Sequence, residues 1–234
     1  MRIKAVLFDK DGTLIDFGDT FFEACSKIIV QLSYDNDQLA EKLADAVGFD
    51  LQTHECTAAS EIVGGTSMTI ARIWQPILDR GTVDQLCLEL DSYFDKYTEL
   101  AVTAFDFTKP TLRKLSKMNV ALGVATNDSE NNARHHLHAI DVETMFTFVA
   151  GYDSGFGPKP EPGMINAFAS QQKITQNQIV MVGDSINDLL AGRNAGAVAV
   201  AVTSGLANSD ELQPFADHVI SDISKLPQLL VDLA

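Results

Sequence analysis

The sequence is poor in cysteine and in long apolar runs, and each shortage excludes a class of protein. Its 234 residues include three cysteines with no CxxC spacing or histidine pairing, which argues against disulfides or a zinc site and favours buried thiols. The weakly polar run Ala195–Val202 is far too short to span a bilayer. The apolar segment Ala5–Phe8 is closed by Asp9 and is too short for a secretory signal. We therefore expect a cytoplasmic protein.

Basic residues are also scarce. Lys and Arg number 17 against 32 Asp and Glu, which gives a formal net charge of −15. Nucleic acids and anionic membranes select for clusters of Lys and Arg, so we expect neither as a partner. The charge is uneven, because residues 17–100 carry 15 acidic and 5 basic side chains, a net charge of −10, and the remainder carries −5. This partition supports a division into two units.

Short apolar runs that end in polar residues alternate with helical patterns. The expected strands are Lys4–Phe8, Val120–Ala125, Phe146–Ala150, Ile179–Val182 and Ala197–Val202. The expected helices are Pro110–Met118, Ser129–Ile140, Pro162–Lys173, Ile186–Ala195 and Ile223–Leu233. This alternation predicts an α/β fold, a Rossmann-like parallel sheet flanked by helices.

One interval, between about residues 17 and 101, contains no convincing strand. Its patterns fit amphipathic helices at Thr20–Leu32, Asn36–Val47, Ser67–Leu78 and Val83–Leu100, separated by glycines. We therefore predict an all-α domain at residues 17–101, inserted between the two parts of an α/β core domain, residues 1–16 and 102–234.

The segment that begins at Asp9 carries the clearest chemical signal. In extended backbone, residues i and i+2 project to the same side, so the carboxylates of Asp9 and Asp11 should converge beyond the first strand. Carboxylates that close repel one another, and a hard divalent cation such as Mg²⁺ relieves the repulsion. Gly12 lets the backbone turn away behind the pair. An ordinary Asp-Gly turn uses the same residue types, so this segment alone does not decide between a site and a loop.

Three further segments follow expected strands. Thr126 and Asn127 offer a hydroxyl and helix-start amides to an anion. Lys159 lies between two prolines, which should hold it on a stiff, largely extended segment as a fixed positive charge. Asp184 leaves a strand, and Asp188 follows one helical turn later on the same face. Each segment also has a plain structural explanation, as a helix cap, a solvated lysine or acids that complement a helix dipole.

All four segments share one edge of the predicted sheet. The carboxyl ends of the strands of a parallel α/β sheet lie together, and such folds place their sites there. A carboxylate pair, a hydroxyl, a fixed cation and a second acidic pair are together suited to binding a metal ion and a phosphate. Their joint occurrence favours a functional site over four unrelated loops.

These motifs resemble those of the haloacid dehalogenase (HAD) superfamily of aspartyl-phosphate hydrolases. In chain order, the four matching segments are Asp9-Lys10-Asp11-Gly12-Thr13, Thr126-Asn127, Lys159 within Lys-Pro-Glu-Pro, and Gly183-Asp184-Ser185 with Asp188. The resemblance covers the whole expected core. The inserted helices resemble the C1-type cap of phosphoglycolate phosphatases and related subfamilies.

The resemblance implies a phosphatase that acts on a small phosphomonoester of the phosphoglycolate or sugar-phosphate type. Asp9 would attack phosphorus to form an aspartyl-phosphate. Asp11 would protonate the leaving group and then activate the hydrolytic water. Thr126 and Lys159 would be catalytic and, with Asn127, would bind the phosphate of the substrate.

The same resemblance implies Mg²⁺ as cofactor. Asp9, a backbone carbonyl at Asp11 and Asp184 would bind the ion, with Asp188 acting through water or from behind these ligands. The partner is then a small phosphate ester, and the protein a monomer or a homodimer.

Two alternatives remain open. A phosphosugar mutase of the same fold keeps all four motifs and would release an isomerised product instead of phosphate. A phospho-acceptor signalling or binding module also combines acidic residues, Thr and Lys around Mg²⁺. The Asp-x-Asp spacing and the large insertion argue against the module, and stable phosphorylation of Asp9 would support it.

Substrate recognition is expected to involve the inserted helices. Gly64 and Gly65 permit a close backbone approach to a substrate, although a plain turn between helices explains them equally well. Arg72 is our candidate for binding a second anionic group, as in phosphoglycolate. A separate cluster, His135, His136 and His138, is expected to form a solvated helix surface.

Overall fold

The protein consists of two compact units. The computed structural model describes residues 3–16, 18–56, 60–98 and 102–233. One unit comprises Met1–Asp16 with Thr103–Ala234 and is called the α/β unit, and the other comprises Phe17–Val102 and is called the helical unit. The sequence places the domain boundaries at residues 17 and 101, which lie outside the described residues. No helix in the described part of the chain is long and apolar enough to cross a membrane.

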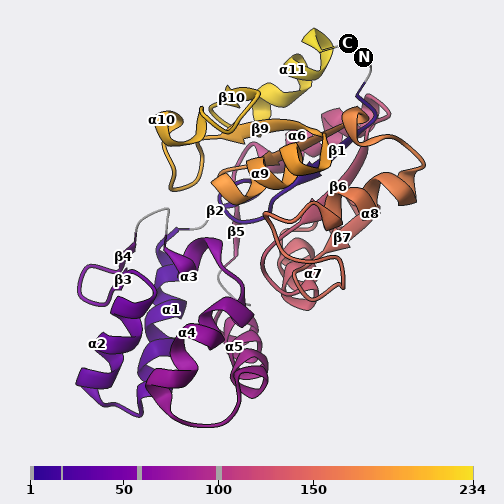
Figure 1. The fold of residues 1–234 in the computed structure, drawn as a ribbon. Helices are drawn as coiled ribbons and strands as arrows, with labels where there is room; N and C mark the ends of the chain where they lie inside the picture. Colours follow the sequence, from indigo (N-terminus) through magenta and orange to yellow (C-terminus); the bar gives the residue numbers. More distant parts are fainter. Residues whose placement is uncertain (1–2, 17, 57–59, 99–101, 234) are drawn as a thin grey trace. The chain divides into compact units, whose positions relative to one another are not determined.

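The α/β unit is built on a six-stranded sheet in which every neighbouring pair is parallel (Figure 1). From edge to edge the strands are β10 (His218–Ile220), β9 (Val198–Val202), β8 (Ile179–Gly183), β1 (Ala5–Phe8), β6 (Ala121–Ala125) and β7 (Phe148–Ala150). This arrangement confirms the predicted parallel α/β sheet. Strand β10 was not predicted, because its three half-buried residues at the sheet edge form no apolar run.

Helices flank this sheet. They are α6 (Thr108–Lys117), α7 (Glu130–Ala139), α8 (Gly163–Gln172), α9 (Ile186–Ala195), α10 (Ser209–Leu212) and α11 (Leu226–Asp232), with 3-10 turns at Glu143–Met145, Gln176–Gln178 and Ile223–Lys225. Helices α8 and α9 contribute Phe168 and Ala191 to a core that also contains Leu7 of β1 and Met181 of β8. These buried apolar side chains hold the central strands in place.

The order of the strands reverses at β1. From β1 the chain runs outward through β6 and β7, then returns to the opposite side of β1 and continues through β8, β9 and β10. In open α/β sheets, ligand sites lie beyond the carboxyl ends of the strands at such a reversal. The segments that follow β1 and β8 are therefore the first place to look for a site.

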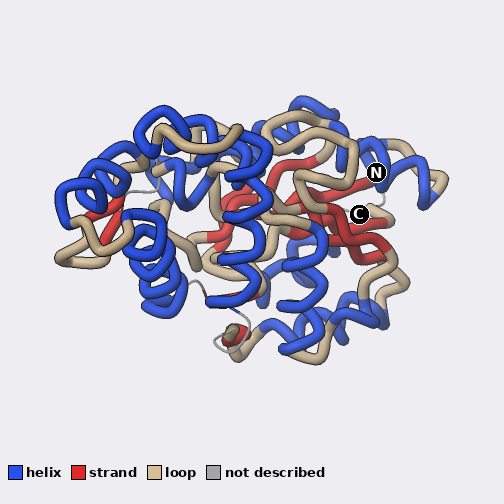
Figure 2. The backbone as a smooth tube through the Cα atoms, turned by 90° about the horizontal axis from the view of Figure 1, so that it is seen from below, coloured by secondary structure: helices blue, strands red, loops and turns tan. Residues whose placement is uncertain are grey.

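The helical unit consists of α1 (Gly18–Ser33), α2 (Asp37–Ala46), α3 (Glu61–Gly64), α4 (Ser67–Leu78) and α5 (Val83–Thr98). Trp74 of α4 is fully buried, and its indole N–H donates to the Leu43 carbonyl of α2 at 2.8 Å. The helical pattern indicated neither the one-turn helix α3 nor a short antiparallel ladder of β3 (Phe49–Asp50) with β4 (Glu55–Cys56) (Figure 2). Two residues per strand are too few to show an alternating pattern.

Candidate active site

Asp9 lies directly beyond the central strand β1. Its backbone N–H donates to the Val182 carbonyl at 2.8 Å, so the residue continues the ladder between β1 and β8, and its side chain is buried. The backbone then turns at Gly12, which has a φ of +70°. A Cβ at Gly12 would lie 2.4 Å from Oδ2 of Asp184, so only glycine allows this approach.

Three buried carboxylates form an acidic cluster at this edge of the sheet. One oxygen from each of Asp9, Asp184 and Asp188 lies within 4.8 Å of the others. Burial, reinforced by the charge of Asp188, raises the pKa of Asp9 to about 7. Burial and the charge of Asp9 likewise raise the pKa of Asp184 well above its usual range. A cation placed among these oxygens therefore stabilises the ionised carboxylates of the cluster.

Lys159 supplies such a cation. Its Nζ lies 2.5 Å from Oδ1 of Asp9 and 2.6 Å from Oδ1 of Asp188, and the side chain is buried. Burial opposes a charged lysine, but the charges of Asp188 and Asp9 outweigh it and raise the pKa of Lys159. The ammonium is thus a fixed positive charge inside a site that is otherwise acidic.

The backbone around Lys159 differs from the extended segment that the flanking prolines suggested. The N–H of Glu161 donates to the Pro158 carbonyl at 2.8 Å and closes a turn, and the Lys159–Pro160 peptide is cis. Asn127 of the preceding motif holds this turn, because its Nδ2 donates to the Lys159 carbonyl at 3.0 Å and its Oδ1 accepts from the Lys159 N–H at 2.8 Å. The Asn127 side chain thus orients Lys159.

Asp188 has a structural role as well as its place in the cluster. Its Oδ2 accepts from the Ser185 hydroxyl at 2.6 Å and from the Ser185 N–H at 3.0 Å. The second of these bonds, with the donation of the Asp188 N–H to the Ser185 hydroxyl oxygen at 3.3 Å, forms the capping box at the start of α9. Oδ1 of Asp188 accepts from Lys159. One Asp188 side chain thus caps α9 and also belongs to the acidic cluster, whereas the sequence suggested that it complements the helix dipole or belongs to a metal site.

Thr126 follows β6 and is almost completely buried. Its hydroxyl oxygen accepts from the N–H of Asp128 at 3.1 Å, and its own N–H donates to the Ala150 carbonyl at 3.0 Å. These bonds place a hydroxyl at the start of the segment that leads into α7, the position expected for a group that contacts an anion.

Asp11 lies outside the acidic cluster. Its carboxylate is paired with Lys10, with Nζ to Oδ2 at 2.7 Å, and its side chain is 26% exposed. Lys10 itself is 1% exposed and also contacts Oδ2 of Asp128 at 3.1 Å and Nδ1 of His136 at 2.8 Å. The sequence offered Asp9 and Asp11 as a converging pair, but their carboxylates have different cationic partners.

His136 therefore corrects the expectation of a solvated histidine cluster. His135 and His138 are exposed, but His136 is buried, and burial together with the Lys10 charge lowers its pKa to about 3. The sequence analysis gave Lys10 no role and placed His136 at the surface, so it did not predict their contact. The available signal was spacing, since His136 lies four residues after the buried Asn132 and shares its helix face.

Local structure explains the candidate residues of the helical unit. Gly64 ends α3, and Gly65 caps it with a geometry in which a Cβ would lie 2.3 Å from the Glu61 carbonyl oxygen. Thr66 then caps α4, its hydroxyl accepting from the Thr69 N–H at 3.1 Å. Arg72 is exposed on α4. The two glycines form the turn between helices that was one of their two explanations.

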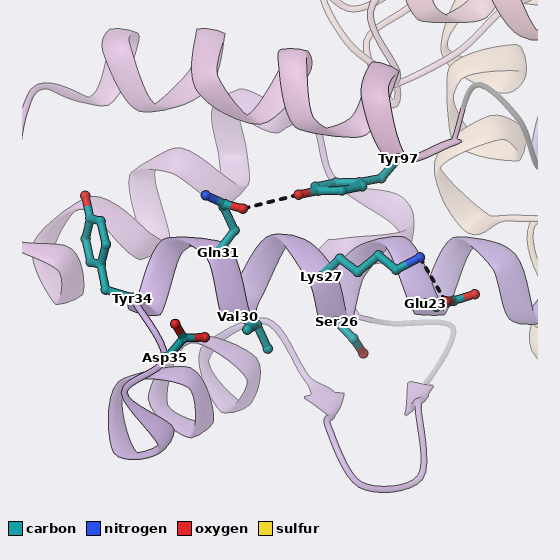
Figure 3. A pocket seen from close by; sticks show the side chains of 8 residues that line it. All are labelled: Glu23, Ser26, Lys27, Val30, Gln31, Tyr34, Asp35 and Tyr97. Carbon is teal, nitrogen blue, oxygen red and sulfur yellow. Dashed lines mark hydrogen bonds and ion pairs between the residues drawn. The ribbon is translucent and has the colours of Figure 1, made fainter.

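A shallow groove of about 460 Å³ also lies in the helical unit (Figure 3). Lys27 and Glu23 on α1 pair with each other at 2.8 Å, and the hydroxyl of Tyr97 donates to Oε1 of Gln31 at 3.3 Å. The Lys27–Glu23 pair is at least half exposed. The Lys27–Glu23 pair of this groove lies at the surface, unlike the buried Lys159 and carboxylates of the acidic cluster.

Comparison with known proteins agrees with this geometry. Residues 6–202 match the family model described as haloacid dehalogenase-like hydrolase. A phosphoglycolate phosphatase of Photorhabdus laumondii subsp. laumondii is 29% identical over 207 residues, 87% of this chain and 81% of that protein. A phosphoglycolate phosphatase of Aliivibrio fischeri is 24% identical over 232 residues, 99% of this chain and 98% of that protein.

A solved structure, of a hydrolase from Pseudomonas syringae, has the same fold with a TM-score of 0.72 and 19% identity over 99% of each chain. The chain therefore belongs to the haloacid dehalogenase-like hydrolase family, as the four motifs predicted. It is an enzyme, a hydrolase whose two relatives above are both named phosphatases.

Proposed function

We propose that this protein is a Mg²⁺-dependent phosphatase that hydrolyses a small phosphomonoester through an aspartyl-phosphate on Asp9. The observation that carries the proposal is the acidic cluster of Asp9, Asp184 and Asp188 with Lys159 at its centre, at the carboxyl edge of the sheet. Membership of the hydrolase family and the names of its relatives support the same class of reaction.

The residues of the cluster fit Mg²⁺. The ion prefers hard oxygen ligands and is held by one or two carboxylates together with water and phosphate oxygens. The side chains of Asp9 and Asp184 with the backbone carbonyl of Asp11 would hold it, and Asp188 would act through water. When bound, Mg²⁺ supplies positive charge to the phosphoryl oxygens.

The chemistry of the protein residues follows two displacements at phosphorus. An Asp9 carboxylate oxygen forms a bond to phosphorus as the bond to the ester oxygen breaks, and Asp11 gives its proton to that departing oxygen. Asp11 then takes a proton from water, whose oxygen attacks phosphorus and breaks the bond to Asp9. Inorganic phosphate leaves, and Asp9 and Asp11 return to their starting states.

The remaining motif residues bind the phosphoryl group. The Thr126 hydroxyl and the Asn127 N–H donate to its oxygens, and the Lys159 ammonium neutralises charge that develops on them. The Asn127 side chain acts on this group through Lys159, whose backbone it holds. In this proposal Asp9 attacks phosphorus, Asp11 transfers protons and Lys159 neutralises charge, so each role has its own residue.

The substrate class we propose is a small ester of the phosphoglycolate or sugar-phosphate type. The names of the two relatives support phosphoglycolate. A substrate with a carboxylate needs a second cationic group, and Arg72 of the helical unit remains our candidate because its side chain is exposed.

A panel of esters tests the proposal. The protein is incubated with phosphoglycolate, p-nitrophenyl phosphate or a hexose 1-phosphate plus a bisphosphate activator, with Mg²⁺ or with EDTA. We expect inorganic phosphate only when Mg²⁺ is present. Isomerised hexose phosphate without phosphate release would instead identify a mutase, and a stable phosphorylated Asp9 a phospho-acceptor module.

A further inference from the structure

The buried Lys10 is a cation that the proposed reaction leaves without a role. We propose that Lys10 is a positioning residue, which holds the carboxyl group of Asp11 for proton transfer and is itself fixed by Asp128 and His136. The inference rests on the proposed function, because it assigns Lys10 to the acid–base step of that reaction.

Three different groups surround the Lys10 ammonium. Its Nζ lies 2.7 Å from Oδ2 of Asp11, 3.1 Å from Oδ2 of Asp128 and 2.8 Å from Nδ1 of His136. An ammonium group has three N–H donors, and each has an acceptor here. Because the side chain is also 1% exposed, no N–H remains for a phosphate oxygen. Lys10 therefore acts on the reaction through Asp11, whereas Lys159 reaches the acidic cluster directly.

The other two partners of Lys10 are rigidly held. Oδ1 of Asp128 accepts from the Ser129 N–H at 2.7 Å, and its Oδ2 accepts from Nδ2 of Asn132 at 2.8 Å. His136 is buried on α7, two turns into the helix. Lys10 thus connects the first motif to the helix that follows the second motif. Asp11, at 26% exposure, is the most accessible member of this network.

This arrangement suits a proton donor. As Asp11 gives its proton to a leaving oxygen, its carboxyl group becomes negative, and an ammonium already in place stabilises that charge without rearrangement. The same contact fixes the direction in which the carboxyl group points. Loss of Lys10 would leave Asp11 ionising without a partner and free to rotate.

The leaving group separates this role from a purely structural one. An alkoxide such as that of phosphoglycolate needs a proton to depart, but p-nitrophenolate does not. Lys10→Met keeps the length of the side chain and removes its charge. We expect it to slow the first turnover of phosphoglycolate about 100-fold, within the usual range for acid–base catalysis, and that of p-nitrophenyl phosphate less than about 5-fold.

The second half of the reaction gives an independent readout. Because Asp11 also activates the hydrolytic water, rapid mixing of Lys10→Met with p-nitrophenyl phosphate should release about one p-nitrophenolate per enzyme at once and then continue slowly. Wild-type enzyme should show a smaller burst or none. Equal slowing of the first turnover with both substrates, or unchanged kinetics, would overturn the inference.

Histidine variants test the anchor and cover the case in which Lys10→Met fails to fold. His136→Gln keeps an acceptor for Lys10 and His136→Leu removes it, so Leu should show the substrate-dependent loss and Gln should restore at least half of the wild-type rate. His138→Leu, on the exposed side of α7, is the matched control and should behave as wild type. Equal rates for His136→Gln and His136→Leu would contradict the anchoring role. Absence of phosphate release by wild-type enzyme would instead contradict the proposed function.

Discussion

The α/β unit buries two charged lysines in addition to its exposed ion pairs, whereas the ion pairs described in the helical unit are partly or largely exposed. In the α/β unit, Lys10 and Lys159 are almost inaccessible to solvent and pair with carboxylates around the acidic cluster. In the helical unit, the ion pairs Lys27–Glu23 and Arg80–Glu89 lie at least partly in solvent. Burying an ammonium group costs several kcal/mol unless its partners compensate. This cost is about an order of magnitude larger than the stabilisation that an exposed ion pair contributes. The contrast therefore indicates where charge serves chemistry and where it serves solubility.

The largest expected effect is loss of the nucleophile. Asp9→Asn should lower kcat at least about 10⁴-fold, because an amide does not form the acyl phosphate. The fold should persist, since the change removes one of three mutually repelling carboxylates. Phosphate release and thermal unfolding measure the two effects. Asp106→Asn, at an exposed position of the same unit, is the control, and near-normal turnover by Asp9→Asn would contradict the proposed mechanism.

A matched pair of substitutions tests the comparison of the units directly. Lys159→Met leaves Asp9 and Asp188 without their partner and should cost about 3–5 kcal/mol in the free energy of unfolding when Mg²⁺ is absent. Lys27→Met breaks an exposed pair with Glu23 and should cost less than about 1 kcal/mol. Urea denaturation in EDTA measures both. Similar losses for the two variants would break the comparison.

The pH dependence of stability tests the comparison of the two units further. The pKa of His136 falls from 6.5 to about 3 in the folded protein, so the unfolded chain takes up a proton first as the pH drops. The stabilisation is fully present above about pH 6.5 and is lost toward pH 3, with a slope of up to about 1.4 kcal/mol per pH unit. Denaturation of His136→Gln across this range should show a flatter slope.

The smallest effect is expected in the helical unit. Arg72→Ala should raise KM for phosphoglycolate about fivefold, the loss of one exposed ion pair, and leave KM for p-nitrophenyl phosphate unchanged. Steady-state kinetics with the two esters measures the ratio. An unchanged preference would reject Arg72 as a contact for the second anionic group.

Much of the fold was predictable because local signals agreed with it. Helix α9 has the predicted bounds, since Ser185 caps its start and Gly196, with a φ of +80°, ends it. Strand β10 was not predicted, because pairing with β9, and not its own residue pattern, makes it a strand. Propensity within a short segment says little about such edge strands.

The candidate site, like the fold, could be predicted from the sequence only in part. Its motif residues could be predicted from the sequence, because each follows a strand and the topology of a parallel sheet brings the strand ends together. The Lys10–His136 contact was not readable, because its partners lie 126 residues apart and neither is unusual in its own segment. Likewise, nothing in its own segment indicated that the Asn127 side chain would hold the backbone of a lysine 32 residues away. Contacts between distant segments depend on three-dimensional packing that periodicity does not encode.

The two-residue ladder where the chain leaves and re-enters the α/β unit has a consequence for folding. Ile15 of β2 (Ile15–Asp16) pairs with Ala104 of β5 (Thr103–Ala104), so the ends of the insertion are neighbours. The entropic cost of closing a loop rises only with the logarithm of its length, by about 0.6 kcal/mol for each doubling. In the topology of the central sheet, the helical unit is therefore equivalent to a loop whose two ends are neighbours. Insertions of very different size could occupy this position without disturbing the pairing of β1 with β6.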